Sequence, residues 1–377
     1  MNDPLLRTLA RLAAVLTLGV IVLGAFVRLS DAGLGCPDWP TCYGKATWPR
    51  SEAAIASANQ AFPERPVELP KAWKEQVHRH AAAVLGLLVL ALALRANWPR
   101  PLARGALLAA AAAAAAGTVL YMRGHAGASV LFSVLALGLP LLVAWRPGEG
   151  ARPWARYTAV LLAVIMFQAM LGMWTVTWKL KPVVVMAHLM GGMTVLCLLV
   201  WLALRAGPQA RGLPGAYWLR PWLWLGIVVL AAQIALGGWT SANYAALACP
   251  DFPTCLGRWW PETDFAEAFV LWRGIGVDYE GGILDGTARA TIHLSHRIGA
   301  LVASAVLLLV SAALLRVRGL RGDAAVLAVL LAVQVALGIS NVVFGLPLAV
   351  ATAHNGVAAL LLAQLVRVLS RVSPARG

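Results

Sequence analysis

Residues 167–175 read FQAMLGMWT, and two similar stretches follow, AQIALGGWT at 232–240 and VQVALGISN at 333–341. All three contain Gln-x-x-Leu-Gly within an apolar segment, and VIVLGAFVR at 20–28 matches them without the glutamine. Each of these segments is followed by another segment with one histidine near its start: His78, His188, His296 and His354. The sequence therefore contains four repeats of a unit that consists of two apolar segments and one histidine.

Composition and hydropathy place the chain in a membrane. Hydrophobic residues make up 60% of it and charged residues only 12%, and its mean hydropathy is +0.75. Apolar runs close to the roughly 20 residues that cross a bilayer recur throughout. The first run has no small-residue cleavage site, so we expect it to be retained. We predict ten spans, near residues 8–28, 79–95, 103–121, 127–145, 156–177, 183–204, 222–240, 292–315, 323–341 and 348–367.

The net charge of +15 follows the topology of such a protein. Arginine clusters fall in alternate gaps between the apolar runs, and positive charge marks the cytoplasmic side of a membrane protein. The pattern predicts a multi-pass protein of the cell inner membrane with cytoplasmic termini, and it places the long segments 29–77 and 241–291 outside. It argues against nucleic-acid binding, because membrane insertion already explains the charge. The clusters are Arg7 and Arg11, Arg95 to Arg104, Arg146 to Arg156, Arg205 to Arg220, Arg316 to Arg321 and Arg367 to Arg376.

The repeat predicts two similar halves, each made of two helix pairs and one long outer segment. Four spans is an even number, so the second half enters the membrane in the same orientation as the first, which indicates parallel repeats. Each half is expected to form a four-helix bundle that holds a cofactor between facing helices. We predict an all-α polytopic fold with an N-terminal half at 1–204, a cytoplasmic linker at 205–221 and a C-terminal half at 222–377.

Residues 101–146 have no counterpart in the second half. They contain an alanine run at 109–116 and a second apolar run. An extra transmembrane hairpin fits, because two crossings leave the downstream topology unchanged. The alanine-rich helix is only weakly hydrophobic, so we expect a partner helix or a contact between copies of the chain to cover it.

The four repeated histidines indicate a heme site in each half. Ionisable groups inside a membrane are costly and are by default functional hypotheses. Two imidazoles that face each other across a four-helix bundle can ligate one heme iron from both sides. A non-heme metal fits less well, because no carboxylate cluster accompanies the histidines. For any one of these histidines taken alone, a hydrogen bond to a backbone carbonyl group is a simpler interpretation than metal ligation. Outside the pattern, His80 and His125 are interpreted as interfacial or loop residues, and His293 as a candidate to line the second pocket.

The two halves differ at one charged position. Glu75 precedes His78 by three residues, whereas His293 occupies the matching place before His296. Residues three apart lie on one helix face, so an acid beside one heme alone suggests that this heme is chemically changed. A helix N-terminal acid that is favourable to the dipole is the alternative. The arginines that follow the two histidines, Arg79 and Arg297, fit either a heme propionate contact or simple snorkelling at the interface.

In combination these features resemble the heme A synthase family, which includes mitochondrial cytochrome oxidase assembly relatives. The resemblance covers nearly the whole chain except 101–146. It rests on the four histidines, the Glu-x-x-His-Arg start, the Gln-x-x-Leu-Gly-x-Trp-Thr helices and the two cysteine loops. It implies an eight-helix core that oxidises the C8 methyl group of heme O to the formyl group of heme A.

The resemblance also implies a role for each motif residue. His78 and His188 would hold the substrate heme O, Glu75 would be the essential acid, and His296 with His354 would hold a resident heme b that passes electrons. The expected partners are membrane lipid, heme O, the farnesyltransferase that makes it, an unidentified electron acceptor and a further copy of the chain. An unactivated methyl C–H bond is beyond acid–base catalysis, so iron must supply the oxidation.

Two other classes of function fit part of the pattern. A di-heme electron-transfer cytochrome b explains the four histidines but leaves the acid of one half unexplained. A heme-handling chaperone or exporter explains the outer location of the loops but needs no second resident heme.

The cysteine loops read GLGCPDWPTCYG at 33–44 and LACPDFPTCLG at 247–257. They match the extracytoplasmic loops of the resembling family, in which the first pair is oxidised. Disulfides persist outside the cytoplasm, and the spacing lacks the Cys-x-x-Cys of zinc sites. We therefore expect disulfides Cys36–Cys42 and Cys249–Cys255, each beside the outer end of one heme bundle.

Overall fold

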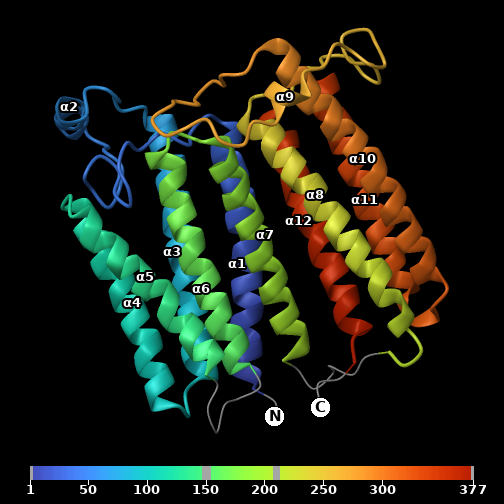
Figure 1. The fold of residues 1–377 in the computed structure, drawn as a ribbon, viewed down its shortest axis with the longest axis horizontal. Helices are drawn as coiled ribbons and strands as arrows, with labels where there is room; N and C mark the ends of the chain where they lie inside the picture. Colours follow the sequence, from blue (N-terminus) through green and yellow to red (C-terminus); the bar gives the residue numbers. More distant parts are fainter. Residues whose placement is uncertain (1–2, 147–153, 207–212, 375–377) are drawn as a thin grey trace.

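The computed structural model describes residues 3–146, 154–206 and 213–374, and it contains ten long apolar helices (Figure 1). This confirms the predicted all-helical polytopic fold of about ten spans. The long helices are α1 (Pro4–Leu29), α3 (Leu69–Ala96), α4 (Pro101–Met122), α5 (Ala126–Trp145), α6 (Ala155–Thr177), α7 (Pro182–Arg205), α8 (Arg220–Ala242), α10 (Gly286–Leu315), α11 (Arg321–Val343) and α12 (Leu348–Arg371). The short elements are α2 (Glu52–Ala61), α9 (Phe265–Ala268), η1 (Tyr217–Leu219) and η2 (Arg318–Leu320).

Two helices begin earlier than the hydropathy pattern predicts. The α3 helix starts at Leu69 rather than near 79, and α10 starts at Gly286 rather than near 292. Their first turns are polar, so a hydropathy window excludes them, but local signals still start the helices. Pro70 occupies the first turn of α3, where its missing N–H costs nothing. Asp285 caps α10 by accepting a hydrogen bond from the Ala288 N–H.

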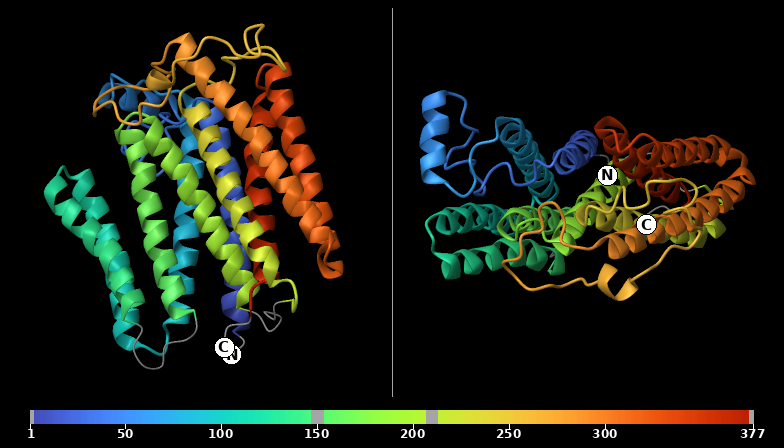
Figure 2. Two further views of the ribbon diagram at one scale, coloured as in Figure 1. Left: turned by 45° about the vertical axis from the view of Figure 1, so that its right-hand side comes forward. Right: turned by 90° about the horizontal axis from the view of Figure 1, so that it is seen from above.

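The eight repeated helices form two bundles of four. In the N-terminal bundle α1, α3, α6 and α7 pack in a closed square, and in the C-terminal bundle α8, α10, α11 and α12 do the same. Between the bundles α7 packs on α12, α1 on α12, and α7 on α8. The contact of α1 with α12 is thus matched by the equivalent contact of α8 with α7. A two-fold axis along the helix direction relates the two bundles in this way (Figure 2). The predicted chain divisions at 204 and 222 stay predictions.

The extra hairpin of α4 and α5 lies at one end of the molecule and packs on α6 and α3 (Figure 2). Its helices approach closely, because small residues of α4 face α5. A side chain added at Gly117 would come 3.2 Å from the Cβ of Phe132. Small residues allow such close packing in membranes, where van der Waals contact drives helix association. The alanine run therefore has a partner helix, α5.

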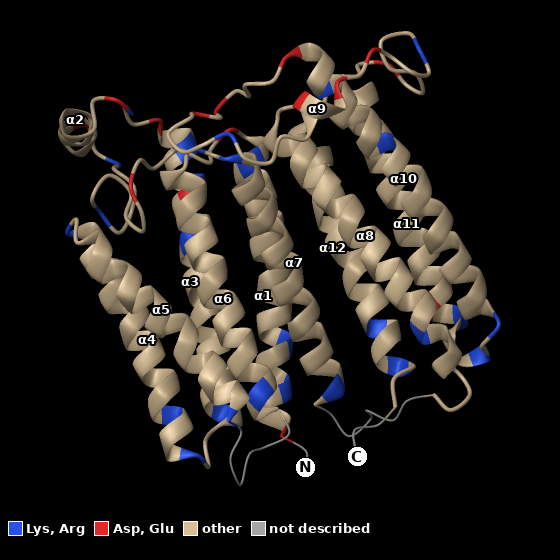
Figure 3. Ribbon diagram, in the orientation of Figure 1, with Lys and Arg blue, Asp and Glu red and all other residues tan. Residues whose placement is uncertain are grey.

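The two faces of the helix array differ in character. Both cysteine loops and the short helices α2 and α9 lie on one face, called here the loop face, and the described chain ends lie on the opposite face (Figure 1). Lysine and arginine gather at the helix ends of that opposite face (Figure 3). Its assignment to the cytoplasm stays a prediction from the charge pattern.

An ion-pair cluster joins α11 to α12 on the face opposite the loops. Asp323, which is 4% exposed, pairs with Arg371 and, at 3.2 Å, with Arg367. Gln364 also donates to the Asp323 carboxylate and backbone oxygens at 3.3 and 3.2 Å. This buried carboxylate therefore has all its partners on one neighbouring helix.

Replacing Asp323 with Ala is expected to destabilise the protein by about 2 kcal/mol. The change leaves Arg371 and Gln364 without their shared acceptor, and removing one member of a buried pair costs more than losing a surface pair. Thermal unfolding in detergent measures the effect. The exposed Glu262 provides the control, Glu262→Ala, and equal stability of the two variants would contradict the assigned role.

Candidate functional site

Each repeated histidine lies against a glycine of the helix before it. A Cβ atom added at Gly24 would come 2.9 Å from the Cε1 atom of His78, and one at Gly172 would come 3.2 Å from that of His188. The C-terminal bundle repeats the contact at 3.1 Å for both Gly237 with His296 and Gly338 with His354. Real Cβ atoms rarely approach so closely. The glycine of the Leu-Gly repeat is therefore the space into which an imidazole fits.

The glutamine of the repeat contacts the same histidine. The Gln168 side chain donates to the backbone oxygen of His188 at 2.5 Å, and Gln233 donates to that of His296 at 3.0 Å. Gln233 also lies 3.1 Å from the His296 Nδ1 atom. Gln334 approaches the ring of His354, with 3.3 Å between the two Nε2 atoms.

The two histidines of the N-terminal bundle face each other. The ring centroids of His78 and His188 are 6.5 Å apart and their planes lie at 79°. A ligand nitrogen lies about 2 Å from a metal and about 1 Å from its ring centre, so two axial imidazoles have centres about 6 Å apart. The separation therefore fits one iron between the rings.

The histidine nitrogens also fit this interpretation. The Nδ1 atoms of His78, His188 and His354 are buried and lack a close hydrogen-bond partner. Each ring instead has a backbone contact with the residue at the glutamine position of the preceding helix, which is Val20, Gln168 or Gln334. Unsatisfied buried polar atoms are uncommon in folded proteins and need an explanation. An imidazole ligates iron through one unprotonated nitrogen, and a buried ring with few polar partners keeps such a nitrogen available.

The two cysteine loops have the same internal structure. Disulfides join Cys36 to Cys42 and Cys249 to Cys255, as predicted. In the first loop the Asp38 carboxylate accepts hydrogen bonds from the Thr41 hydroxyl and from the backbone N–H groups of Tyr43 and Gly44. In the second loop Asp251 makes the same three contacts with Thr254, Leu256 and Gly257. Both loops contain a cis X–Pro bond.

The Asp251 carboxylate lies outside the membrane-spanning helices. The Thr254 hydroxyl, together with the N–H groups of Gly257 and Leu256, lowers the pKa of Asp251 to about 2. A lowered pKa means that the ionised form supports the folded loop. Its contribution is complete above the unfolded pKa of about 4 and is lost as the pH falls through about 2. The loop is therefore fully supported at neutral pH.

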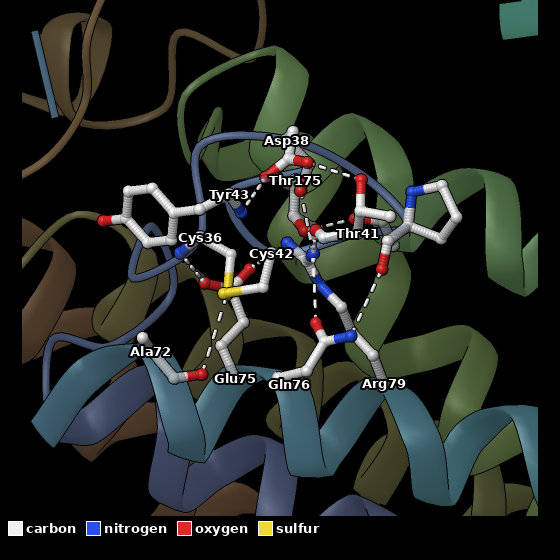
Figure 4. Close-up of polar contacts among 12 residues, drawn as sticks. Cys36, Asp38, Thr41, Cys42, Tyr43, Ala72, Glu75, Gln76, Arg79 and Thr175 are labelled. Atoms are coloured by element: carbon white, nitrogen blue, oxygen red, sulfur yellow. Dashed lines mark hydrogen bonds and ion pairs between the residues drawn. A yellow bond between two sulfur atoms is a disulfide. The ribbon is translucent and has the colours of Figure 1, made fainter. Parts of the chain in front are cut away.

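The first cysteine loop is bonded to α3 one turn before His78 (Figure 4). Glu75, which is 4% exposed, accepts a hydrogen bond from the Cys36 N–H at 2.8 Å and one from Arg79 at 2.5 Å. Arg79 also donates to the backbone oxygens of Asp38 and Thr41 at 2.8 and 2.6 Å. Glu75 and Arg79 thus connect the loop to the histidine helix.

The second cysteine loop is bonded to α10 at the equivalent positions. The Nδ1 atom of His293 accepts from the Cys249 N–H at 3.2 Å, as Glu75 does from Cys36. Arg297 donates to the backbone oxygens of Cys249, Asp251 and Thr254 at 2.8, 2.9 and 2.7 Å. His293 therefore contacts the loop. The sequence analysis identified His293 as a candidate to line the second pocket, but it did not predict the contact with Cys249.

Both arginines contact loop carbonyl groups, which the sequence interpretation did not include. The acceptors are backbone carbonyl groups of the loops. Every residue has such a group, so the sequence does not show which of them an arginine contacts. A propionate contact of Arg79 or Arg297 stays a prediction.

Of the remaining histidines, His80 contacts the backbone oxygen of Ala46 in the outer segment at 3.0 Å, and His125 precedes α5 in the hairpin turn. Both positions agree with their interpretation as loop or interfacial residues.

Residues 270–284, called here the strap, connect the second half to the first and were not predicted. The strap runs from α9 across the loop face toward the N-terminal bundle (Figure 1). Its Asp278 and Glu280 pair with Arg65 of the first outer segment at 3.0 and 2.5 Å. Tyr279 is buried in a cluster that includes Leu34, two residues before Cys36.

The strap also contacts the link between α6 and α7. The Tyr279 N–H donates to the Lys179 backbone oxygen at 3.1 Å. Lys181 donates to the Gly274 backbone oxygen, and its ammonium lies 3.3 Å from the ring centroid of Trp272. The first cysteine loop is thus packed between its own bundle and a segment of the other half.

The chain is similar to known proteins over most of its length. The model of a family described as "Cytochrome oxidase assembly protein" matches residues 7–136 and 127–366. A protein of Shewanella oneidensis named Heme A synthase is 41% identical over 365 residues, which cover 96% of this chain and 95% of that protein. Proteins of the same name from Rhizorhabdus wittichii and Caulobacter vibrioides are each 26% identical over 94% and 93% of this chain and 90% and 91% of theirs.

Replacing Gly172 with Ala is expected to lower the amount of heme bound in the N-terminal bundle by about tenfold. The added methyl group would displace His188, and changes beside a metal ligand commonly cost 10–100-fold in affinity. Pigment extraction from the purified protein measures the loss. Gly19→Ala is the matched control, because a Cβ there meets nothing within 4 Å; similar heme contents in both variants would contradict the predicted effect.

Proposed function

The chain belongs to the family of cytochrome oxidase assembly proteins, and we propose that it is a heme A synthase, which oxidises the C8 methyl group of heme O to a formyl group. The observation that supports this most directly is the asymmetry between two equivalent bundles. The rings of His78 and His188 face each other in the N-terminal bundle, and His354 interacts electrostatically with His296 in the C-terminal bundle. Among the described residues, the N-terminal pair alone has a buried carboxylate one turn from a histidine, Glu75.

In this proposal His78 and His188 hold the substrate heme O in the N-terminal bundle. The 6.5 Å between their ring centroids fits an iron atom. The methyl group is oxidised first to a hydroxymethyl group, with loss of two electrons. A second oxidation of the same kind adds another hydroxyl group to give a geminal diol, which loses one water molecule to leave the aldehyde. The membrane setting suits the substrate, because its farnesyl chain can stay in an apolar medium.

Glu75 is the proposed catalytic acid. It lies one helical turn from His78 and is nearly inaccessible to solvent. Each oxidation step releases protons, and a buried carboxylate at this place can accept one or orient the water that carries it. The Cys36 N–H and Arg79 fix the position of both carboxylate oxygens, so the loop and Arg79 act as positioning groups.

His296 and His354 would hold a heme b in the C-terminal bundle. The group would supply one-electron redox chemistry, and its potential would depend on the axial ligands and their surroundings. The chain contributes the two imidazoles, the glycines that make room for them and the glutamines that contact them. Arg79 and Arg297 are proposed to contact propionates, in addition to the loop carbonyl groups. The buried Nε atom of Arg297 has no hydrogen-bond partner.

We place the protein in the cell inner membrane with both termini in the cytoplasm and the loop face outside. Lipid surrounds the spans, and the heme O-producing farnesyltransferase is the proposed source of substrate. The electron acceptor and the oxygen source are not assigned, and a homo-oligomer remains part of the proposal. The halves at 1–204 and 222–377, joined by 205–221, are proposed to act as substrate and electron-transfer units.

Replacing Glu75 with Gln is expected to reduce heme A formation by about 100-fold or more, since acid–base groups commonly contribute 10²–10⁴-fold. Heme O should still be bound, because the histidines are unchanged. Extraction and chromatography of the pigments after expression with a heme O source measure both quantities. The control is Glu68→Gln, which changes an exposed acid of the same outer segment. Product at the normal level would show that Glu75 is not catalytic.

Replacing Cys36 and Cys42 with Ser is expected to lower heme A yield about tenfold, because the loop positions Glu75 through the Cys36 N–H. The same change at Cys249 and Cys255 should instead lower heme b content, since that loop contacts α10. Measuring both pigments in both double variants separates the two effects. If the first pair is only a structural cross-link, protein yield will fall while product per molecule stays constant.

A further inference from the structure

The glutamine contact is absent from one of the four histidines. Gln168, Gln233 and Gln334 each contact the next histidine, but the first repeat has Val20 at the equivalent place. An aliphatic side chain cannot donate a hydrogen bond, so α1 offers His78 the glycine space at Gly24 without the glutamine side-chain contact. Three histidines have a glutamine side-chain contact with their partner helix, whereas the recorded contact of His78 with α1 is to the backbone of Val20.

The cysteine loops provide a second kind of contact, and only two histidine helices receive it. On α10, Arg297 and His293 bind the second loop, so His296 is held by a loop as well as by Gln233. On α3, Glu75 and Arg79 bind the first loop. His78 is therefore the one repeated histidine that lacks a glutamine contact, and its helix is bonded to the first cysteine loop instead.

The N-terminal bundle is also the one whose heme must enter, react and leave. A ligand pair with two equally firm histidines would oppose that passage, whereas unequal ligands allow one side to open. Polar partners of a ligand commonly change metal affinity by 10–100-fold. The two histidines of this bundle therefore differ in their polar partners, since only His188 has a glutamine contact.

We propose that His78 is the exchangeable ligand of the substrate heme and that His188, tied by Gln168, is the permanent one. This inference rests on the proposed function, and it specifies which side of the site opens. Glu75 lies one turn from His78 on the same helix, so the side that opens is the side that carries the acid. Gln168 is accordingly a positioning residue, and the valine at position 20 is part of the specialisation of this bundle.

The first test compares the two histidines by heme content. The full-length protein is expressed with a heme O source, and the farnesyl chain distinguishes pigment of the N-terminal bundle from heme b. His78→Ala is expected to keep heme O with the spectrum of a single histidine ligand. His188→Ala is expected to retain about tenfold less. Equal losses, or a greater loss in His78→Ala, would overturn the proposal.

The second test restores the missing contact with Val20→Gln and uses carbon monoxide as the probe. The reduced wild-type protein should bind carbon monoxide at one heme, and Val20→Gln should slow that binding about tenfold while leaving the content of both pigments unchanged. Val15→Gln, the same substitution at a position of α1 that is 72% exposed, is the control and should match the wild type. An unchanged rate in Val20→Gln would contradict the proposal.

Failure of the proposed function has a different signature. A wild-type protein that binds heme b but no heme O or oxidised derivative would overturn the assignment of the substrate site, and with it this inference. In contrast, normal heme O binding with equivalent histidine variants would overturn only the assignment of His78 as the exchangeable ligand.

Discussion

The close approach of an imidazole to a glycine on the neighbouring helix is the constraint on which the rest of the structure depends. It occurs four times, and a Cβ atom added at the glycine would come within 2.9–3.2 Å of the ring in each case. In a bilayer, helices gain little from hydrophobic burial against each other, so close packing decides their spacing. A glycine opposite each histidine lets the helix pair close while a bulky polar ring stays inside. The spacing of each bundle is thereby matched to what it must contain.

In both halves, hydrogen bonds connect the cysteine loop to a helix of the bundle. Each disulfide-closed loop presents one backbone N–H to the helix that carries a histidine, and the acceptor is Glu75 in one bundle and His293 in the other. An arginine one turn later binds the loop carbonyl groups in both. The scaffold is therefore the same, and a single side chain distinguishes the bundle with an acid from the bundle without one. Such a substitution changes the chemistry of the site at little structural cost, because the hydrogen bond to the loop is kept.

The parts of this structure that follow from local pattern could be predicted, and those that depend on distant contacts could not. Bilayer thickness imposes a length on each span, so the ten helices and the extra hairpin were found from hydropathy. Internal repetition identified the four histidines as equivalent positions, and it showed that Glu75 occupies the position that His293 has in the second half. The early starts of α3 and α10 were missed because their polar first turns carry the contacts to the loops. The loop contacts of Arg79 and Arg297 are to backbone atoms, which have no sequence signature. The strap was missed for a similar reason, since Arg65 lies more than 200 residues from Asp278.

The two bundles differ in their glutamine contacts and in the segments that contact their cysteine loops. In the C-terminal bundle the second cysteine loop and two glutamines act within that half. In the N-terminal bundle one glutamine is missing, and the strap from the other half supplies Tyr279 to the cluster beside the first cysteine loop. A resident cofactor benefits from permanent contacts, because any opening of its site wastes affinity. A substrate site must open in every cycle, and contacts borrowed from another segment can be broken without unfolding the bundle. The missing glutamine and the strap are therefore the features expected of the N-terminal bundle if it holds the proposed transient heme.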